Sequence, residues 1–531
     1  MSNQIHIIQN AITTTISEIF RGDFRRICEV KKAVLHLEAI YFCHGTCYLL
    51  KRENMPIKDQ LALYQRIELI PQSTTEFFEN NRECIINNWP EESALAAKPE
   101  ILYDALLASE FCVQPERVGY KIDKVSRDIA GAYYTSSDFS AQITYSALES
   151  YMDRKRRRAI DSDSFACCNE YENITFLDYS CGCGEFLLAV IQYFDNHVLG
   201  YSRKKLATQL RGVDVNPIAL MITIARIVSA VEAEDDENLL REVAKNFIVG
   251  NPLLHSDKIA PLEVRFDNFA LNRLYAETEG INCLELEQQN LVVLGNPPWE
   301  KLRFEERAFF RPVCPAISAI SQKNKREKEI KKLAVNWLEL LEYYQLLQDD
   351  YASVKKEIPK HPLLKVSLVG ELNTYAMFAE LASRLTEKDG FAAIIVKSAL
   401  VTSTCYSSCF RHFVNQGSLS EVFLFDNREK LFQIDSREKF CVLFFGGEHA
   451  GGIKVHYGLT KQEQILSSVP INVTSEELEL INPETGLLPN VADSKEFSFL
   501  LRTHRSLSVF AKEFPKCHFG RLVHLTAHAE H

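Results

Sequence analysis

The sequence predicts an α/β protein built around a mainly parallel sheet. Short apolar runs recur along the middle of the chain, and each ends in a turn that carries a polar side chain. The first of these runs leads directly into a helical pattern. This order of strand, turn and helix is typical of sheets that bind ligands across the carboxyl ends of their strands.

The first predicted strand and helix lie in residues 174–194, which read ITFLDYSCGCGEFLLAVIQYF. The strand ends at Asp178, and Phe186 begins an apolar series at helical spacing. Gly182 and Gly184 in the turn allow the backbone to approach a ligand closely. The turn lacks the third glycine of the dinucleotide fingerprint, and the sequence contains no P-loop. A nucleotide-type site without a pyrophosphate cradle is therefore indicated.

Two further strands end in side chains that suit a nucleoside. Residues 210–217 (LRGVDVNP) place Asp214 at a strand tip, where a carboxylate suits the two hydroxyls of a ribose. Residues 247–254 (FIVGNPLL) end at Asn251, whose amide can bind an adenine edge. Because the carboxyl ends of parallel strands share one edge of a sheet, these side chains and Asp178 outline a single ligand site.

The fourth strand, in residues 291–299 (LVVLGNPPW), ends in an amide, two prolines and an indole. Pro297 and Pro298 fix φ and lack N–H donors, so the neighbouring carbonyls are available as acceptors. Asn296 adds an acceptor and Trp299 an aromatic face, so the turn can hold a planar amine while its ring stacks. Taken alone, the pattern is as typical of a strand that ends in a proline turn.

Together these elements resemble the S-adenosylmethionine-dependent amino-methyltransferases of DNA, specifically the γ-type adenine-N6 enzymes. The resemblance implies a Rossmann-like, seven-stranded methyltransferase sheet. It also implies that Asn296, Pro297, Pro298 and Trp299 form the catalytic turn that holds the target amine. By the same resemblance, the residues that bind S-adenosylmethionine are Thr135, Asp178, Cys181, Gly182, Gly184, Phe186, Asp214 and Asn251.

The matching elements extend from about Tyr133 to Phe445 in the γ order. Residues 131–143 (GAYYTSSDFSAQI) are similar to the segment that closes over the cofactor, and residues 372–398 to the next helix, turn and strand. Residues 430–445 are similar to the segment whose aromatic residue stacks the flipped base opposite the indole. By position this residue is Phe432, for which a role as a core phenylalanine is equally open.

Several positions depart from the family pattern, namely Ser136, Tyr179, Asn251 and Lys397. These departures permit an alternative in which the chain is an inactive methylase-like subunit of a defence complex. Cytosine-N4 methylation uses the same turn and is a second alternative. Protein glutamine methylation also uses an Asn-Pro-Pro-Tyr turn, but the indole and the additional terminal regions of this chain argue against it.

Composition sets the limits of this interpretation. The chain has 531 residues with 46% hydrophobic content, enough for more than one core. It has no apolar run long enough to span a membrane and no signal peptide, so we expect a cytoplasmic protein without a membrane partner. The 15 cysteines are expected to be reduced thiols, and no C-x-x-C pair suggests a metal site.

The net charge of −11 argues mildly against a surface that binds nucleic acid everywhere. Two basic runs can still contact phosphates, namely residues 154–158 (RKRRR) and 323–332 (KNKREKEIKK). Glutamates interrupt the second run, which slightly favours an ordinary solvated helix face there.

The chain divides into a helical N-terminal region (1–118), a methyltransferase catalytic domain (119–447) with a helical insert at about 303–370, and a C-terminal region (448–531). The Gly-Arg-x-x-His-x-Thr stretch at 520–526 resembles the junction where larger methylases begin target recognition. The last region is thus a candidate start of a truncated target-recognition domain. The expected function is site-specific adenine-N6 methylation in a restriction-modification or phage-defence system. The expected partners are double-stranded DNA with a flipped adenine and a separate recognition subunit or defence-complex partner.

Overall fold

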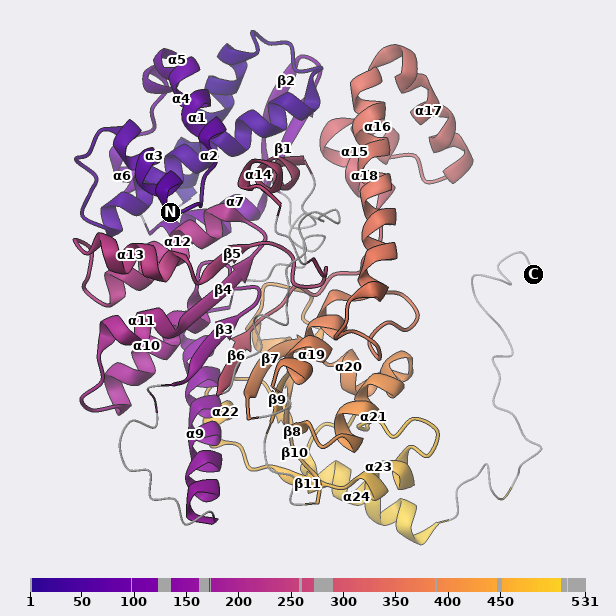
Figure 1. Cartoon of the computed structure of the whole chain (residues 1–531). Helices are drawn as coiled ribbons and strands as arrows, with labels where there is room; N and C mark the ends of the chain where they lie inside the picture. The colour runs from indigo at the N-terminus through magenta and orange to yellow at the C-terminus, as the bar shows by residue number, and fades with distance from the viewer. Residues whose placement is uncertain are drawn as a thin grey trace.

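The computed structural model places a helical N-terminal region above one side of a large central sheet, with a group of helices standing beside that region (Figure 1). Among the helices in the described part of the chain, none has the length and apolar character needed to cross a bilayer. The structure describes residues 2–96, 98–122, 135–161, 171, 173–256, 260–271, 290–386, 389–446, 451–507 and 513.

The N-terminal region is built around α2, which is buried over most of its length because apolar residues occupy nearly every side of the helix. Shorter helices surround it, and a hairpin of β1 and β2 ends the region, where the sequence pattern predicted helix. The elements are α1 (Ser2–Ile19), α2 (Ile27–Leu49), α3 (Ile57–Arg66), α4 (Gln72–Asn80), α5 (Arg82–Asn87), α6 (Glu92–Leu95), α7 (Pro99–Leu107), β1 (Ser109–Gln114) and β2 (Arg117–Ile122).

The central sheet has nine strands in the order β11-β10-β8-β9-β7-β6-β3-β4-β5. Strand β9 pairs antiparallel with both β7 and β8, and β11 pairs antiparallel with β10; the remaining neighbours are parallel. The strands are β3 (Thr175–Asp178), β4 (Leu210–Asp214), β5 (Phe247–Val249), β6 (Leu291–Gly295), β7 (Phe391–Lys397), β8 (Leu419–Asp426), β9 (Lys439–Phe445), β10 (Ile453–Leu459) and β11 (Ile471–Val473).

The predicted strand count of seven is wrong, because β10 and β11 extend the sheet at one edge. Strand β10 pairs with β8, and its residues Ile453, Val455 and Leu459 are buried against the core. Without this strand the apolar face and backbone groups of β8 would form an exposed edge. The predicted α/β class is otherwise confirmed.

Helices cover the sheet and connect its parallel strands. Helix α10 packs against β3, α12 against β4 and β5, and α19 against β7. Strand β6 is buried at every position, so it lies at the centre of the core. The helices are α9 (Ser137–Asp161), α10 (Glu185–His197), α11 (Arg203–Gln209), α12 (Pro217–Ala230), α13 (Glu237–Ala244), α14 (Leu262–Leu271), α19 (Thr374–Leu385), α20 (Ala399–Thr402), α21 (Ser407–Asn415), α22 (Gln464–Ser467), α23 (Ser475–Ile481) and α24 (Ser494–Ser506).

A helical insert separates β6 from α19. It lies beside the N-terminal region, and its long helix α18 leads back to the sheet (Figure 1). Trp337 anchors the insert to the N-terminal region, because its Nε1 donates to the Arg25 carbonyl at 2.7 Å. The insert comprises α15 (Glu306–Val313), α16 (Pro315–Ser318), α17 (Lys323–Asn336), α18 (Leu338–Glu357) and the short 3₁₀ turn η3 (Ile358–Lys360).

Candidate functional site

The ends of β3 and β6 meet directly at the carboxyl edge of the sheet. Strand β3 ends at Asp178, and β6 pairs beside it and ends at Gly295, which precedes the Asn-Pro-Pro-Trp turn. A Cβ added to Gly295 would lie only 2.7 Å from Asp178 Oδ1. The Asp178 carboxyl therefore rests against the backbone from which the turn begins.

The turn after β3 is fixed to the end of β4. Asp214 Oδ2 accepts a hydrogen bond from the Gly182 N–H at 2.8 Å, and its Oδ1 accepts one from the Asn216 N–H at 2.8 Å. The Cys181 N–H donates to the Val213 carbonyl at 3.0 Å. Two strand ends that are separate in the sequence thus form one continuous loop edge.

The two glycines of the turn have different surroundings. Gly182 has a φ of +51°, and no atom lies within 4 Å of the position that a Cβ would take. Gly184 has a φ of +85°, and an added Cβ would approach the Thr223 side chain to 2.7 Å. Both need glycine for their backbone conformation. The open space lies over Gly182, whereas Gly184 allows α10 to pack closely against α12.

Cys181 and Phe186 are buried. Phe186 begins the apolar side of α10 and belongs to the hydrophobic core, so it supports the turn from below. Two polar residues of α12 also hold this turn. The Thr223 hydroxyl donates to the Gly182 carbonyl at 2.7 Å, and Arg226 donates to the Cys183 carbonyl and to Glu185.

The Asp178 carboxyl is almost completely buried, and burial raises its pKa to about 8 because the charged form loses hydration. The negative charge of Asp214 raises the pKa further, while a hydrogen bond from the Ser180 N–H at 3.0 Å opposes the shift. The pKa of Asp214 is also raised by burial, against hydrogen bonds from the backbone N–H groups of Asn216, Gly182 and Val215. At the carboxyl edge of the sheet, the carboxyl of Asp178 is therefore mostly protonated at neutral pH, and the carboxyl of Asp214 is held by backbone N–H donors.

Asn251 lies at the end of β5, where its Oδ1 accepts a hydrogen bond from the Leu253 N–H at 3.0 Å. The preceding residue, Gly250, donates from its N–H to the Asp214 carbonyl at 2.9 Å. The third strand end is thereby joined to the second. The Asn251 oxygen thus caps its own turn.

The Asn-Pro-Pro-Trp turn is held by residues from two distant segments. Asn296 Nδ2 donates to the hydroxyl of Thr135 at 3.1 Å, and Thr135 is itself buried. The Thr374 hydroxyl, at the start of α19, donates to the Pro298 carbonyl at 2.6 Å. The structure thus brings Thr135 and Asn296 together, although 161 residues separate them in the sequence.

Trp299 and Phe432 are both buried and touch each other. Their ring centroids are 5.2 Å apart with the planes at 68°, and Trp299 Nε1 donates to the Ile395 carbonyl at 3.4 Å. For a base to stack between two parallel rings, the planes of those rings must be about 7 Å apart, which is twice the optimal carbon–carbon contact distance of about 3.5 Å. In this arrangement the two rings pack edge to face with no room for a base between them.

Sequence reasoning missed Thr374, Thr223 and Arg226. For the last two, a signal was present, because they lie three residues apart in the otherwise apolar helix PIALMITIARIVSA. Polar residues at that spacing share a helix face and indicate a specific partner. Thr374 offers no comparable signal, since its contact with Pro298 depends on how α19 meets the end of β6.

Comparison with known proteins finds no matching family model and no matching curated protein. Among solved structures, the chain is similar to DrdV in a DNA complex at 12% identity and a TM-score of 0.42, covering 89% of this chain and 46% of that chain. It is similar to a nuclease-deletion mutant of the Type ISP restriction-modification enzyme LlaGI bound to a DNA substrate mimic, at 11% identity and a TM-score of 0.45, covering 94% of this chain and 44% of that chain.

A putative class I S-adenosylmethionine-dependent methyltransferase from Listeria monocytogenes is similar at 10% identity and a TM-score of 0.35, covering 88% of this chain and 97% of that chain. The present chain spans less than half the length of DrdV and of the LlaGI mutant.

Proposed function

We propose that this chain is an S-adenosylmethionine-dependent DNA methyltransferase that modifies adenine N6 in a restriction-modification or phage-defence system. The observation that carries the proposal is the contact between the Asn-Pro-Pro-Trp turn and the nucleoside-binding strand ends. Gly295 rests against Asp178, and Asn296 bonds to Thr135. A turn suited to holding an amine is therefore adjacent to side chains suited to holding a nucleoside.

The sheet order supports the proposal. Strands β5-β4-β3-β6-β7-β9-β8 are contiguous and contain one antiparallel member, β9. These seven contiguous, mainly parallel strands support the proposal of a methyltransferase sheet, which β10 and β11 extend. Its carboxyl edge carries Asp178, Asp214, Asn251 and Asn296, as the doubly wound architecture requires of a ligand site.

The residues at this edge fit S-adenosylmethionine. The open space over Gly182 admits a ligand close to the backbone, and two carboxyl groups suit the ribose hydroxyls and the positive charges of the molecule. We assign Asp214 to the ribose, Asn251 to the adenine edge, and Asp178 and Thr135 to the space beside the turn. S-adenosylmethionine, when bound there, would supply an electrophilic methyl group.

The catalytic contribution of the chain is to activate and position a weak nucleophile. The lone pair of an aromatic amine is delocalised into the ring, so acceptors for both amine hydrogens favour a pyramidal nitrogen. Asn296 Oδ1 and the carbonyl beside Pro297 would accept these hydrogens. Thr135 fixes the carboxamide from its nitrogen side, and Thr374 fixes the backbone of the turn. Positioning and electrostatics then carry the reaction.

An adenine must leave the duplex to reach this turn, at a cost of a few kcal/mol that stacking in the pocket offsets. We propose that Trp299 and Phe432 supply this stacking. Their present edge-to-face contact means that the two rings must separate before a base can enter between them. Phe432 is held as well as Trp299, because its N–H donates to Asn427 Oδ1 at 3.0 Å and its carbonyl accepts from Asn427 Nδ2 at 2.9 Å. Entry of the base therefore requires one of these two anchored rings to move.

The test compares Asn296→Ala with Asn80→Ala, a control at an exposed position on α4. We expect Asn296→Ala to bind S-adenosylmethionine like the wild type in calorimetry and to lose methyl transfer to DNA. Mass spectrometry of the product should find N6-methyladenine; N4-methylcytosine would instead assign the cytosine reaction. Wild-type turnover in Asn296→Ala would refute the assigned catalytic turn. Failure of the wild type to bind S-adenosylmethionine would favour an inactive methylase-like subunit.

A further inference from the structure

The solvent-facing side of α17 carries four exposed lysines, together with Asn324 and Val335. The opposite side of this helix is buried through Arg326, Ile330 and Leu333, which recur at the spacing of one helix face. The solvent-facing set, here called the lysine face, comprises Lys325, Lys328, Lys331 and Lys332. The two glutamates of the helix, Glu327 and Glu329, flank these lysines, and their side chains are 49% and 42% exposed.

The glutamates pair with only one of the four lysines of this face, Lys332. Glu327 pairs with Lys323 at 3.9 Å, one turn towards the start of the helix, and Glu329 pairs with Lys332 at 2.7 Å. Within the described residues, the ion pairs recorded along α17 leave Lys325, Lys328 and Lys331 exposed without an acidic partner. Three of the four lysines are therefore exposed cations without a recorded acidic partner among the described residues, although the glutamates flank them.

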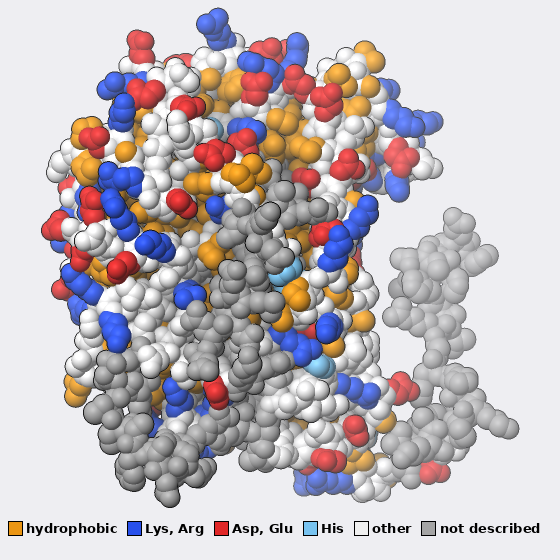
Figure 2. All heavy atoms as spheres, viewed as in Figure 1, with side chains coloured by type: hydrophobic (Ala, Val, Ile, Leu, Met, Phe, Trp, Pro, Cys, Tyr) orange, Lys and Arg blue, Asp and Glu red, His pale blue; other side chains and the backbone are white. Residues whose placement is uncertain are grey.

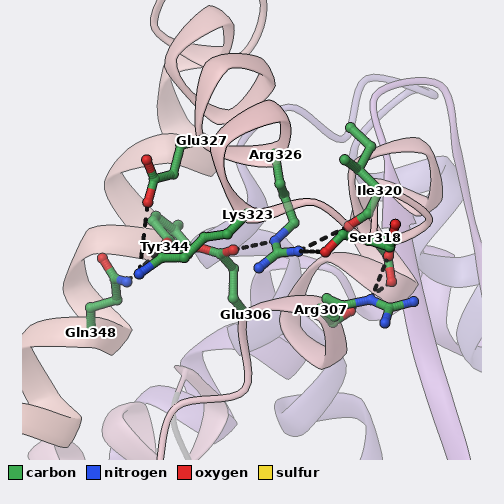
Figure 3. Close-up of polar contacts among 10 residues, drawn as sticks. Glu306, Arg307, Ser318, Ile320, Lys323, Arg326, Glu327, Tyr344 and Gln348 are labelled. Carbon is green, nitrogen blue, oxygen red and sulfur yellow. Dashed lines mark hydrogen bonds and ion pairs between the residues drawn. The ribbon is translucent and has the colours of Figure 1, made fainter. Parts of the chain in front are cut away.

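Polar contacts inside the insert fix the rotation of α17, so that the lysine face has a defined direction. Arg326 points inward and bonds to Glu306, and it donates to the Ile320 carbonyl at 2.9 Å (Figure 3). Tyr344 donates to the other oxygen of Glu306 at 2.6 Å, and Gln348 donates to the Tyr344 hydroxyl at 2.8 Å. Arg326 is thus the single buried cation of α17, and its contacts prevent the helix from turning its lysines inward.

The loop between α15 and α17 is fixed in the same way. Arg307 Nε donates to the Ser318 carbonyl at 3.0 Å, and the Ser318 hydroxyl donates back to the Arg307 carbonyl at 2.7 Å (Figure 3). The insert starts a few residues after the Asn-Pro-Pro-Trp turn. Trp337, at the junction of α17 and α18, attaches it to the N-terminal region. In Figure 2, Lys and Arg side chains project from the outer side of the insert at the upper right. Arg326 and Trp337 thus hold the two ends of α17 in place.

We propose that the lysine face binds the phosphate backbone of the DNA duplex whose base enters the site; this inference rests on the proposed function. Lys325 and Lys332 are seven positions apart, which corresponds to about 10 Å along a helix. Phosphates of one strand recur every ~3.4 Å along the duplex axis, so the face matches about three of them. The chain as a whole carries a net charge of −11. The four exposed lysines are therefore a local concentration of positive charge, which favours binding of a polyanion.

The test uses the full chain with Lys325→Gln, Lys328→Gln and Lys331→Gln combined. The matched control combines Lys454→Gln, Lys461→Gln and Lys495→Gln, which removes the same charge from exposed positions in the C-terminal part. Affinity for a duplex is measured at several salt concentrations, and each lost phosphate contact should reduce the slope of log K against log salt by about 0.9. We expect a reduction of roughly 2 to 3 for the α17 variant and little change for the control.

Methyl transfer provides the second measurement. The α17 variant should show a raised KM for DNA, an unchanged kcat at saturating DNA and wild-type binding of S-adenosylmethionine. If methyl transfer is normal and the salt slope matches the wild type, the proposed binding of DNA by the lysine face is wrong, while the proposed function stands. An equal reduction in both triple variants would reveal a general charge effect and also overturn it. If the wild type binds neither DNA nor S-adenosylmethionine, both proposals fail.

Discussion

The buried carboxyl of Asp178 is the residue whose protonation most affects the site. Its pKa is raised to about 8, chiefly by burial, so the folded protein holds a proton there at neutral pH. A cationic ligand beside it would favour the ionised form, because an opposite charge lowers the pKa of a carboxyl. Asp178 therefore lowers the stability of the ligand-free protein at high pH. With a cationic ligand bound, its ionised carboxylate would interact favourably with the ligand charge.

Asp178→Asn should remove this dependence of stability on pH. Between its ordinary pKa near 3.8 and the folded value of about 8, the unfolded chain has lost the proton while the folded chain keeps it. The unfolded state then binds fewer protons, so the free energy of unfolding falls as the pH rises, by at most about 1.4 kcal/mol per pH unit. Urea denaturation of wild type and Asp178→Asn from pH 4 to 9 should show the variant gaining relative stability across this window. Parallel profiles would contradict the buried protonated state.

Helix α19 anchors the segment that returns from the insert. Its residue Glu380 is fully buried and accepts hydrogen bonds from the N–H groups of Lys365, Val366 and Ser367 at 2.9 to 3.0 Å. The Ser367 hydroxyl donates to the same carboxylate at 2.7 Å. One side chain thus satisfies a stretch of backbone that forms no helix or strand, and it fixes where the insert rejoins the sheet.

Glu380→Ala should destabilise the protein by roughly 1 to 3 kcal/mol, because the buried N–H and hydroxyl groups of Ser367 would lose their acceptor, while Lys365 is exposed and Val366 half-buried. Glu380→Gln keeps one acceptor oxygen and should lose less. Chemical denaturation gives the difference, with the exposed Glu263→Ala as a control that should remain within about 0.5 kcal/mol of wild type. If Glu380→Ala loses no more stability than Glu263→Ala, the hydrogen bonds that Glu380 accepts do not contribute to stability.

At the scale of the whole molecule, the insert connects the N-terminal region to the sheet. Trp337 bonds to the Arg25 carbonyl, and Tyr343 donates to the Leu271 carbonyl at 2.6 Å. Arg311 approaches Glu110 of strand β1 to 3.8 Å. The contacts of Trp337 and Arg311 reach the N-terminal region, and that of Tyr343 reaches the end of α14, so these two parts of the chain together support the insert.

Trp337→Phe should loosen this attachment while keeping an aromatic ring in the core. The variant loses the hydrogen bond to Arg25, a contribution of about 1 kcal/mol, so local opening of the insert becomes more frequent. Hydrogen exchange in α17 and α18 should accelerate, with S-adenosylmethionine binding unchanged. Trp89→Phe, in the N-terminal region away from the insert, should leave this exchange at the wild-type rate. Unchanged exchange in Trp337→Phe would show that the insert is held by its other contacts.

The local elements of the site could be predicted from the sequence alone. Strand ends at Asp178, Asp214 and Asn296, and the helix that begins at Glu185, follow from apolar periodicity and from glycine and proline in the turns. The helices of the insert follow from the same periodicity. These features depend on residues close together in the chain, so their physical cause is visible in a short stretch of sequence.

Contacts between distant segments were decided only by the tertiary structure. Pairing of β10 with β8, the bond between Asn296 and Thr135, and the contact of Trp299 with Phe432 each join segments far apart in the chain. The direction of the lysines on α17 likewise depends on Glu306, which holds Arg326 inward. Periodicity shows which residues share a face, but packing against the rest of the molecule determines what that face meets.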